Sequence, residues 1–508
     1  MYGSYAHVES NSTLNDAGNT AIAVFKAGNY SVSGANITSQ IDDGIAYNPS
    51  NGRFSFDTGG RYFVSFTGYL RLGSINTSTA AFISLNEPDA TERYEMSTFV
   101  WNNADPVERS FQTILEIDPG KGLLPKIKSA AGRTVQFSSA QISFQKIKSE
   151  IYASAEITTN LNADNASAFN PFDDDITAMA RQVSNGITQT MGGSEDGKYT
   201  IQTAGKYVVG ITNVTQGDAT ATNLVKYTLF KNNIAYHILT AARHAATDPV
   251  ERTMTYIMDL SVGDVLHVMW DGTTTIDPYR GTTFCLFKLD EGVCSQDTYF
   301  STFISGTQSN QFGNGEEKNP FQSSSYSGSG FFTTPSVGDN ISYDSSAGKF
   351  TVKNKGYYSA LYANKVAVSA TTPEFTIRFK KNGTGFCSGS SAVNNGVDPV
   401  ERSLGTLVYL NDEDEFSITL SASANTYNSS GSMLSLYRVH DVYYYPETTA
   451  DGLINNDFTI NTYSQGNLST QYCRNVDQVP FKMGVRGAGS LRGRGTNPSV
   501  AKLGDKKN

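Results

Sequence analysis

The strongest constraint in this sequence is a five-residue string, DPVER, that occurs three times and is followed each time by Ser or Thr. DPVERS begins at residue 105, returns as DPVERT at residue 248 and again as DPVERS at residue 398, at intervals of 143 and 150 residues. Self-similarity at a nearly constant period is typical of repeated structural units. A chain of 508 residues is also too long for one compact domain. We therefore predict tandem domains at residues 1–148, 149–290 and 291–440, followed by an extended arm at 441–508.

The hydrophobic pattern between the repeated strings has a period of two. Apolar residues occupy every second position in YFVSF at 62–66, FTIRF at 375–379 and FSITL at 416–420, and in the last two runs the positions between them are polar. Such alternation is typical of half-buried strands, and no convincing helical period of 3.6 residues occurs. The 46 glycines and many Ser, Thr and Asn residues suit a protein with many turns. The sequence predicts an all-β protein made of antiparallel sandwiches.

Other landmarks recur in the same order in each repeat. A Gly-x-aromatic motif is followed by a second one eight residues later, as in GKF at 348–350 and GYY at 356–358. A strand then ends near a turn such as Asn382-Gly383, another enters a turn such as Gly263-Asp264, and the repeat closes with a strand such as LSLYRV at 434–439. This order resembles the tumour necrosis factor and complement globular-head superfamily. The first repeat departs from it, with Asp118-Pro119-Gly120 where Gly-Asp is expected.

The resemblance implies a ten-stranded jelly roll, usually assembled as a tight trimer through an aromatic face and used for binding or assembly. Three such domains in one chain resemble virion structural proteins, particularly those of tailed phages. We therefore predict a non-enzymatic, homotrimeric virion structural protein, either a capsid decoration or a fibre. Its partners would be capsid or tail components. A receptor- or glycan-binding tail spike or adhesin, with a host-surface glycan as ligand, and a glycan-cleaving enzyme are the alternatives.

The termini and the cysteines bear on location and cofactors. The first residues, MYGSYA, lack the basic start and apolar run of a signal peptide, and no segment approaches the about 18 apolar residues of a membrane span. The four cysteines show no CxxC spacing, which argues against a zinc site or a disulfide framework. We expect a protein that folds in the host cytoplasm, joins the virion and needs no cofactor. Acidic loops at 42–43, 173–175 and 412–415 could bind calcium. None has the residue spacing of a calcium-binding loop, so we expect them to be solvent-exposed loops without a metal ion.

The repeated string is itself the most tempting site, because its Asp, Glu and Arg could bind an ion or a ligand in each repeat. However, an identical string in three domains whose loops differ favours a role in folding or subunit contact. We expect that the proline ends a loop, the valine enters the sheet, and the glutamate and arginine form a structural ion pair. The predicted pairs are Glu108 with Arg109, Glu251 with Arg252, and Glu401 with Arg402.

Residues suited to catalysis or to ligand stacking are few. No Gly-x-Ser-x-Gly, HExxH or phosphate-loop motif occurs. A pair of carboxylates that hydrolyses glycosidic bonds is the catalytic arrangement that the sequence leaves open. We expect polar surface roles for the histidines. Of the two tryptophans, Trp270 ends an alternating run and is predicted to be core, whereas Trp101 is the better candidate for stacking on a sugar. The five histidines are His7, His237, His244, His267 and His440.

Tyrosine-rich runs are the candidates for the aromatic face of a homotrimer. Tyr357, Tyr358 and Tyr362 lie in the third repeat, and a further run occupies residues 443–445. One copy of the chain would expose these side chains, and a trimer would bury them.

The C-terminal segment has the opposite charge to the rest of the chain. From residue 474 onward it carries eight basic and two acidic residues, a net of +6, which leaves −15 on residues 1–473 because the total is −9. Its glycines and few aromatics favour an extended arm on an acidic protein surface over nucleic-acid binding. We therefore predict that residues 474–508 attach the protein to its particle. The arginines assigned to this arm are Arg474, Arg486, Arg492 and Arg494.

Overall fold

The structure is a computed structural model, and the residues it describes include the strands of the expected sheets. No helix in this part of the chain is long and apolar enough to cross a membrane. The described residues are strands and the turns between them, so the prediction of an all-β fold is confirmed. The described segments are residues 4–14, 21–26, 37–40, 44–72, 79–87, 91–100, 107–129, 135–160, 168–173, 179–192, 196–216, 223–243, 250–272, 276–289, 299–303, 310–312, 316–323, 336–337, 340–368, 374–392, 400–422 and 427–439.

The first unit is a sandwich of two antiparallel sheets. Its inner sheet has the strand order β3-β1-β11-β6-β9, and its outer sheet has the order β4-β5-β10-β7-β8, with β2 also pairing with β10. The strands are β1 (Ser4–Leu14), β2 (Ile22–Ala23), β3 (Ile37–Gln40), β4 (Ile45–Asn48), β5 (Arg53–Phe56), β6 (Gly60–Leu72), β7 (Thr79–Asn86), β8 (Glu92–Val100), β9 (Val107–Ile117), β10 (Gly122–Ser129) and β11 (Val135–Ile147).

The second unit repeats this strand order. Its inner sheet is β13-β12-β22-β16-β19 and its outer sheet is β14-β15-β20-β17-β18, with β21 pairing with β16. The strands are β12 (Tyr152–Ile157), β13 (Met179–Val183), β14 (Ile187–Gln189), β15 (Tyr199–Ile201), β16 (Gly205–Gln216), β17 (Asn223–Lys231), β18 (Ile234–Arg243), β19 (Val250–Leu260), β20 (Val265–Gly272), β21 (Asp277–Pro278) and β22 (Thr283–Lys288).

The third unit repeats it again, as β26-β23-β34-β29-β32 and β27-β28-β33-β30-β31, so all three are jelly-roll sandwiches of one topology. The first, second and third domains are the units formed by strands β1–β11, β12–β22 and β23–β34. The strands of the third domain are β23 (Tyr299–Phe303), β24 (Asn310–Phe312), β25 (Glu317–Lys318), β26 (Ser336–Val337), β27 (Ile341–Asp344), β28 (Lys349–Val352), β29 (Gly356–Val368), β30 (Glu374–Lys381), β31 (Thr384–Ala392), β32 (Val400–Leu410), β33 (Glu415–Ala422) and β34 (Tyr427–Val439).

Backbone geometry explains why the Gly-x-aromatic motifs recur. Gly60, Gly205 and Gly356 open β6, β16 and β29 with φ values of 138°, 149° and 153°, a region that side chains with a Cβ rarely adopt. The aromatic residue two positions later, as in Tyr62, is fully buried in the domain core. Each motif therefore fixes where one long strand of the inner sheet begins and which face it buries.

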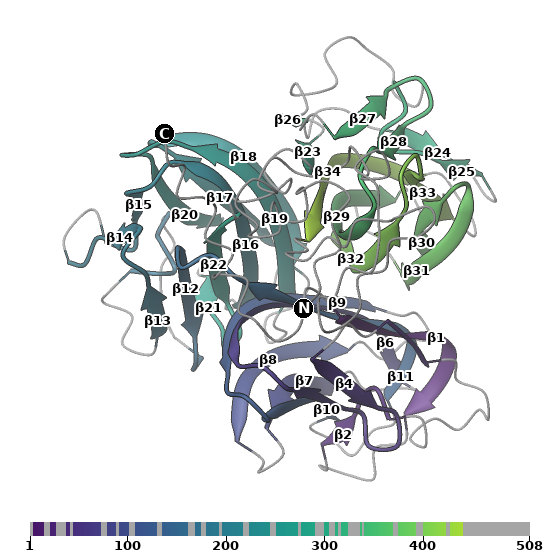
Figure 1. Ribbon diagram of the computed structural model, residues 1–508, viewed down its shortest axis with the longest axis horizontal. Coiled ribbons are helices and arrows are strands. Elements are labelled where there is room, and N and C mark those ends of the chain that lie inside the picture. Colours follow the sequence, from purple (N-terminus) through teal and green to yellow (C-terminus); the bar gives the residue numbers. More distant parts are fainter. Residues whose placement is uncertain are drawn as a thin grey trace, which may run out of the picture.

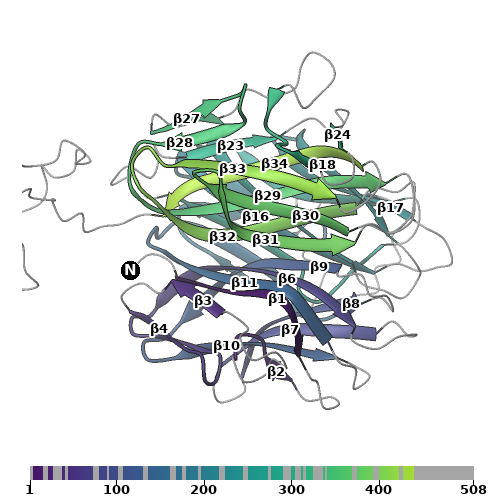
Figure 2. The ribbon, with the colours of Figure 1, turned by 90° about the vertical axis from the view of Figure 1, so that its right-hand side faces the viewer.

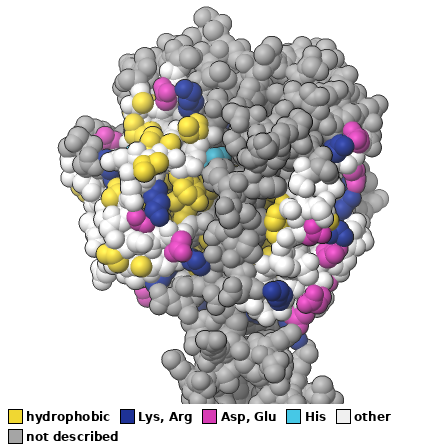
Figure 3. Space-filling model, turned by 90° about the horizontal axis from the view of Figure 1, so that it is seen from above, with side chains coloured by type: hydrophobic (Ala, Val, Ile, Leu, Met, Phe, Trp, Pro, Cys, Tyr) yellow, Lys and Arg dark blue, Asp and Glu magenta, His cyan; other side chains and the backbone are white. Residues whose placement is uncertain are grey.

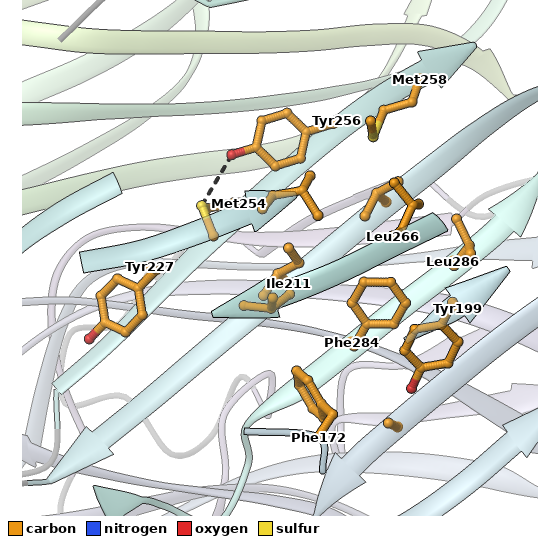
Figure 4. Packing of buried hydrophobic residues seen from close by; sticks show 14 of the residues in the cluster. Phe172, Tyr199, Ile211, Tyr227, Met254, Tyr256, Met258, Leu266, Phe284 and Leu286 are labelled. Atoms are coloured by element: carbon orange, nitrogen blue, oxygen red, sulfur yellow. Dashed lines mark hydrogen bonds between the residues drawn. The ribbon is translucent and has the colours of Figure 1, made fainter. Parts of the chain in front are cut away.

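Each sandwich has its own apolar core between its two sheets. In the second domain, Figure 4 shows Phe172, Tyr199 and Phe284 packed together, and the rings of Tyr199 and Phe284 are stacked with centroids 4.5 Å apart. Met254 and Tyr256 lie farther along the same core, where the Tyr256 hydroxyl donates to the Met254 sulfur at 3.1 Å. The tyrosine hydroxyl is thus satisfied within an otherwise apolar layer.

The three domains are grouped around a common centre. In Figure 1 the inner-sheet strands β9, β19 and β32 face this centre from three directions, and Figure 2 shows the third domain above the first in the view turned by 90°. Inner sheets from three domains of one chain therefore meet at this centre.

Candidate functional site

The residues of the repeated string lie in a buried interface between the three domains, which we call the axial interface. Its apolar part is a cluster to which every domain contributes inner-sheet residues. Because the repeat spacing is 143 and 150 residues along the strands after each string, Ile114, Ile257 and Leu407 are equivalent, and all three belong to this cluster. The buried members are Phe63, Ile114, Ile147, Tyr152, Val208, Ile257, Cys285, Phe287, Leu289, Leu361, Leu407, Tyr437 and Val439.

A polar layer lies two residues before this apolar layer on each strand. Gln112 stands where Thr255 and Gly405 stand in the other two domains. The Gln112 backbone N–H donates to Thr212 Oγ1 at 2.8 Å, and the Gln112 side-chain amide donates to Thr255 Oγ1 at 2.5 Å. Ser435 Oγ in turn donates to the Thr255 carbonyl oxygen at 2.8 Å. Buried hydrogen bonds therefore join the first domain to the second and the second to the third.

A small cavity opens within the polar layer. Its volume of about 10 Å³ is close to the minimum that holds one water molecule. Hydroxyl groups from the first and second domains line it, including those of Ser110 and Thr255, and Gly405 of the third domain leaves room beside them. The Gln112 Oε1 atom beside this layer is buried without a hydrogen-bond partner. The size of the cavity suits solvent rather than an organic ligand.

The repeated string itself supplies the next layer. β9, β19 and β32 all begin at the valine of the string, as the sequence predicted. Arg109, Arg252 and Arg402 are 3%, 4% and 5% exposed, and the described glutamate, Glu108, is 5% exposed. The described side chains of the strings are therefore buried in the contact between domains.

The charges of this layer act across domain boundaries. Ser403 Oγ of the third domain donates to Glu108 Oε1 at 2.7 Å, whereas Arg109 donates to the backbone carbonyl oxygen of Glu108 at 2.6 Å. The pKa of Arg402 is lowered to about 10, chiefly because its guanidinium is buried; Glu108 opposes the shift, and Arg252 and Arg109 add to it. Glu108 of the first domain therefore interacts electrostatically with an arginine of the third domain.

The predicted ion pairs within the three strings stay predictions. The side chains of Glu251 and Glu401 lie outside the described residues. The Glu108 side chain is described, and it accepts a hydrogen bond from Ser403 of the third domain. The sequence could not reveal this contact because it identifies equivalent residues but does not say that their domains meet.

The outer-sheet edge strand of each domain also packs on the inner sheet of the next. Between the first and second domains, the Tyr94 hydroxyl donates to the Gly281 carbonyl oxygen at 2.8 Å, and Arg280 pairs with Glu95 at 2.7 Å and with Glu92. The contact makes the cores continuous, because Val214 of the second domain belongs to the core cluster of the first.

The other two domain pairs follow the same rule. Ala363 and Met433 of the third domain belong to the core cluster of the second, and Tyr69 of the first belongs to that of the third. The Tyr69 hydroxyl donates to the Ser403 carbonyl oxygen at 2.7 Å, and the Cys387 thiol lies 3.1 Å from Gln141 Oε1. The three contacts run in one cyclic sense and close a ring.

This ring changes the basis of the homotrimer prediction. Tyr358 and Tyr362 are buried in the core of the third domain, and Tyr357 packs against the axial interface. The three tyrosines were expected to be exposed in one copy, but the single chain already buries Tyr358 and Tyr362 and partly buries Tyr357. Residues 443–445 lie outside the described part of the chain. Self-association stays a prediction, and the two buried tyrosines do not support it.

The histidine and tryptophan candidates are divided between core and undescribed positions. His237 is buried, its Nδ1 hydrogen-bonds the Tyr256 hydroxyl, and burial lowers its pKa to about 4. His267 is also buried and stacks on Phe230, so the expectation of surface roles is wrong for both histidines. Trp270 is fully buried, as predicted, and donates to Asn213 Oδ1 at 2.7 Å. The side chains of His7, His244, His440 and Trp101 lie outside the described residues.

The acidic loop at 412–415 has a structural role. Asp414 accepts hydrogen bonds from the Asn411 backbone at 2.6 Å and from Asn382 at 2.6 Å, and it pairs with Lys381 at 2.8 Å. These contacts lower the pKa of Asp414 against the opposing effect of burial. No group of three His, Cys, Asp or Glu residues suited to a metal ion occurs within the described segments.

The same turn explains the departure of the first repeat from the family pattern. In the second domain, Asp264 pairs with Lys231 at 2.9 Å. In the first domain the strand register puts Lys121 at the position of Asp264 and Glu87 at that of Lys231, and this pair lies at 3.2 Å. The first domain therefore has the same ion pair with the acidic and basic residues exchanged. Both residues can be identified in the sequence from their positions in the repeat.

The described outer surface is chemically mixed. Seen from above in Figure 3, hydrophobic side chains gather on the left-hand part, whereas acidic and basic side chains are interspersed on the right-hand part. Exposed large hydrophobic residues include Ile234 and Ile238 on β18, at 73% and 52% exposure. The basic arm with Arg474, Arg486, Arg492 and Arg494 lies outside the described residues.

Comparisons with known proteins give matches at the level of single domains. No family model and no curated protein sequence matches the chain. A crystal structure of rabbit GITRL has a TM-score of 0.18 and 15% identity, over 24% of this chain and 93% of the other. Eiger TNF from S. frugiperda has a TM-score of 0.22 and 11% identity, over 30% and 98%. PRD1 vertex protein P5 has a TM-score of 0.22 and 16% identity, over 29% and 99%.

Proposed function

We propose that this chain is a structural virion protein, a capsid decoration or fibre, whose three jelly rolls form one closed head. The observation that carries the proposal is the use of the repeated strings. The described arginines of the three strings, Arg109, Arg252 and Arg402, are each at most 5% exposed, and their charges act on one another between domains. Because these side chains are buried, they are unavailable to a ligand in solution, and using them to hold three domains together suits a structural protein.

The proposal assigns attachment to the arm at residues 441–508. The net of +6 from residue 474 onward contrasts with −15 on the rest, so the arm suits an acidic surface on the particle. The head would then project from the shell while the arm holds it. Capsid or tail components are the proposed partners, and the virion is the proposed location.

A spike that binds a receptor or a glycan is the second candidate. The mixed surface of Figure 3 and the exposed Ile234 and Ile238 would offer it a contact area. Trp270 cannot serve such a site because it is fully buried. The two candidates differ in where the protein lies and in how many copies a particle carries.

The test is the composition of particles with and without the arm. Quantitative mass spectrometry and antibody labelling of purified particles should find many copies over the shell. A chain lacking residues 474–508 should keep the circular-dichroism spectrum and melting behaviour of the full chain but be absent from particles. A few copies confined to a tail would favour the spike. Full incorporation of the truncated chain would place the anchor in a jelly roll, and absence from all particles would refute the proposal.

A further inference from the structure

The contact between the first and third domains is the closing contact of the ring, and we call it the seam. The first and second domains are consecutive, joined between β11 and β12, and the second and third are also consecutive. The first and third domains are not, so non-covalent contacts alone hold the seam. It includes the hydrogen bonds of Tyr69 and of Ser110 to Ser403 and the contact of Cys387 with Gln141.

Tyr69 is the central residue of the seam. It projects from β6 of the first domain, is 1% exposed, and belongs to the core cluster of the third domain. It faces Gly389 on β31, where a Cβ added to the glycine would fall inside the tyrosine ring. A glycine is therefore required here by space: any side chain would displace the ring or the strand.

The equivalent positions at the contact of the first and second domains have other sizes. Val214 follows Gly205 by nine residues, as Tyr69 follows Gly60, and it enters the core of the first domain. Register places Met96 opposite Ile83 as it places Gly389 opposite Ile377, and Met96 shares a core cluster with Val214. We call the side chain at the position of Tyr69 the knob and the space at the position of Gly389 the socket. The seam thus combines a large knob with an empty socket. The contact of the first and second domains combines a smaller knob, Val214, with a socket filled by Met96.

We propose that Tyr69 and Gly389 form a size-matched lock that closes the ring within one chain and sets the cyclic order of its domains. Tyr69 fits the socket of a third domain and is excluded from a socket filled like that of the first domain, which contains Met96. The lock therefore prevents first domains from associating with one another, because a bulky residue would meet a filled socket.

The lock has a consequence for the behaviour of an opened chain. When the seam is broken, the first domain of one chain remains complementary to the third domain of another. Domain exchange between copies then produces dimers and longer assemblies, because the contact is heterologous. Cys387 reports on this opening, since it is 3% exposed and lies in the seam.

The test exchanges the sizes of knob and socket in the full chain, with Cys294 and Cys473 replaced by serine. Gly389→Met should raise the rate at which a thiol reagent modifies Cys387 by about tenfold or more and should produce multimers on size exclusion. Adding Tyr69→Val reproduces the Val214–Met96 combination and should bring the rate back to within about threefold of the parent. Thr384→Met, at an exposed position of the same strand, is the matched control and should change neither readout.

The second-site rescue makes the proposal falsifiable. If Gly389→Met reacts like the parent, or if the double variant reacts as fast as Gly389→Met, the lock does not exist. Cys285, which is buried in the axial interface, reports on global unfolding. When the whole protein unfolds, Cys285 and Cys387 both react at the rate of the unfolded chain. If Gly389→Met unfolds the protein in this way, Gly389→Ala is compared with the double variant Gly389→Ala/Tyr69→Val. Cys387 should then react faster in the single variant than in the double variant. Equal rates in this pair would overturn the proposal.

Discussion

Truncation of one axial side chain measures how strongly the three domains hold together. Ile257 is 2% exposed and lies in the axial interface with Ile114 and Leu407. Ile257→Ala removes three carbon groups, each worth about 0.8 kcal/mol of burial, or about 2.4 kcal/mol in all. The cavity left between domains adds to this, so we expect a loss of about 3–4 kcal/mol in the free energy of unfolding.

Urea unfolding followed by circular dichroism at neutral pH provides the assay. The variant should show a lower midpoint, with one transition that all three domains share because their cores are continuous. Ile238→Ala is the matched control in the same domain, since Ile238 is 52% exposed, and it should change stability by no more than about 0.5 kcal/mol. A loss for Ile257→Ala below about 1 kcal/mol would refute a packed axis.

Two further predictions concern buried charges and pH. Arg402→Ala should lower the free energy of unfolding by about 3–5 kcal/mol, because it leaves Glu108 buried without this cation; a thermal melt like that of the wild type would exclude the structural role. His237 has its pKa lowered to about 4 by burial, whereas an unfolded histidine titrates near 6.5. The unfolded state therefore binds more protons between these pH values, so the neutral histidine's contribution is complete above about pH 6.5 and falls by up to about 3 kcal/mol as the pH drops to 4. Comparing urea midpoints of wild type and His237→Gln at pH 7 and 4.5 checks this, and an equal pH dependence in the two proteins would contradict it.

The sequence was sufficient for the architecture of each domain because local patterns determine it. The glycines at 60, 205 and 356 and the alternating strands predicted the sheets that the structure contains. The Asn382-Gly383 turn likewise joins β30 to β31, and both of its residues have positive φ. Each of these signals acts within a few residues or between neighbouring strands.

The contact between domains was beyond local patterns, although one signal was present. In β9, Phe111 and Leu115 face the domain core, while Gln112 and Ile114 on the opposite face are also buried. A strand with apolar residues on both faces needs two partners. The sequence could identify that second buried face, but it could not say whether a second copy or a second domain covers it. Gly389 carried no sequence signal because its role depends on Tyr69, which is 320 residues away.

The central claim is that the first and third domains of one chain meet at the seam. The hydroxyl oxygens of Ser110 and Ser403 lie 2.8 Å apart, so a pair of cysteines at these positions lies within disulfide reach. The measurement is mass spectrometry and non-reducing electrophoresis of the oxidised Ser110→Cys/Ser403→Cys variant, with Cys294 and Cys473 replaced by serine. We expect a cross-link within a single chain of 55.0 kDa. Cross-linked species of twice that mass or more, or no cross-link at all, would contradict it.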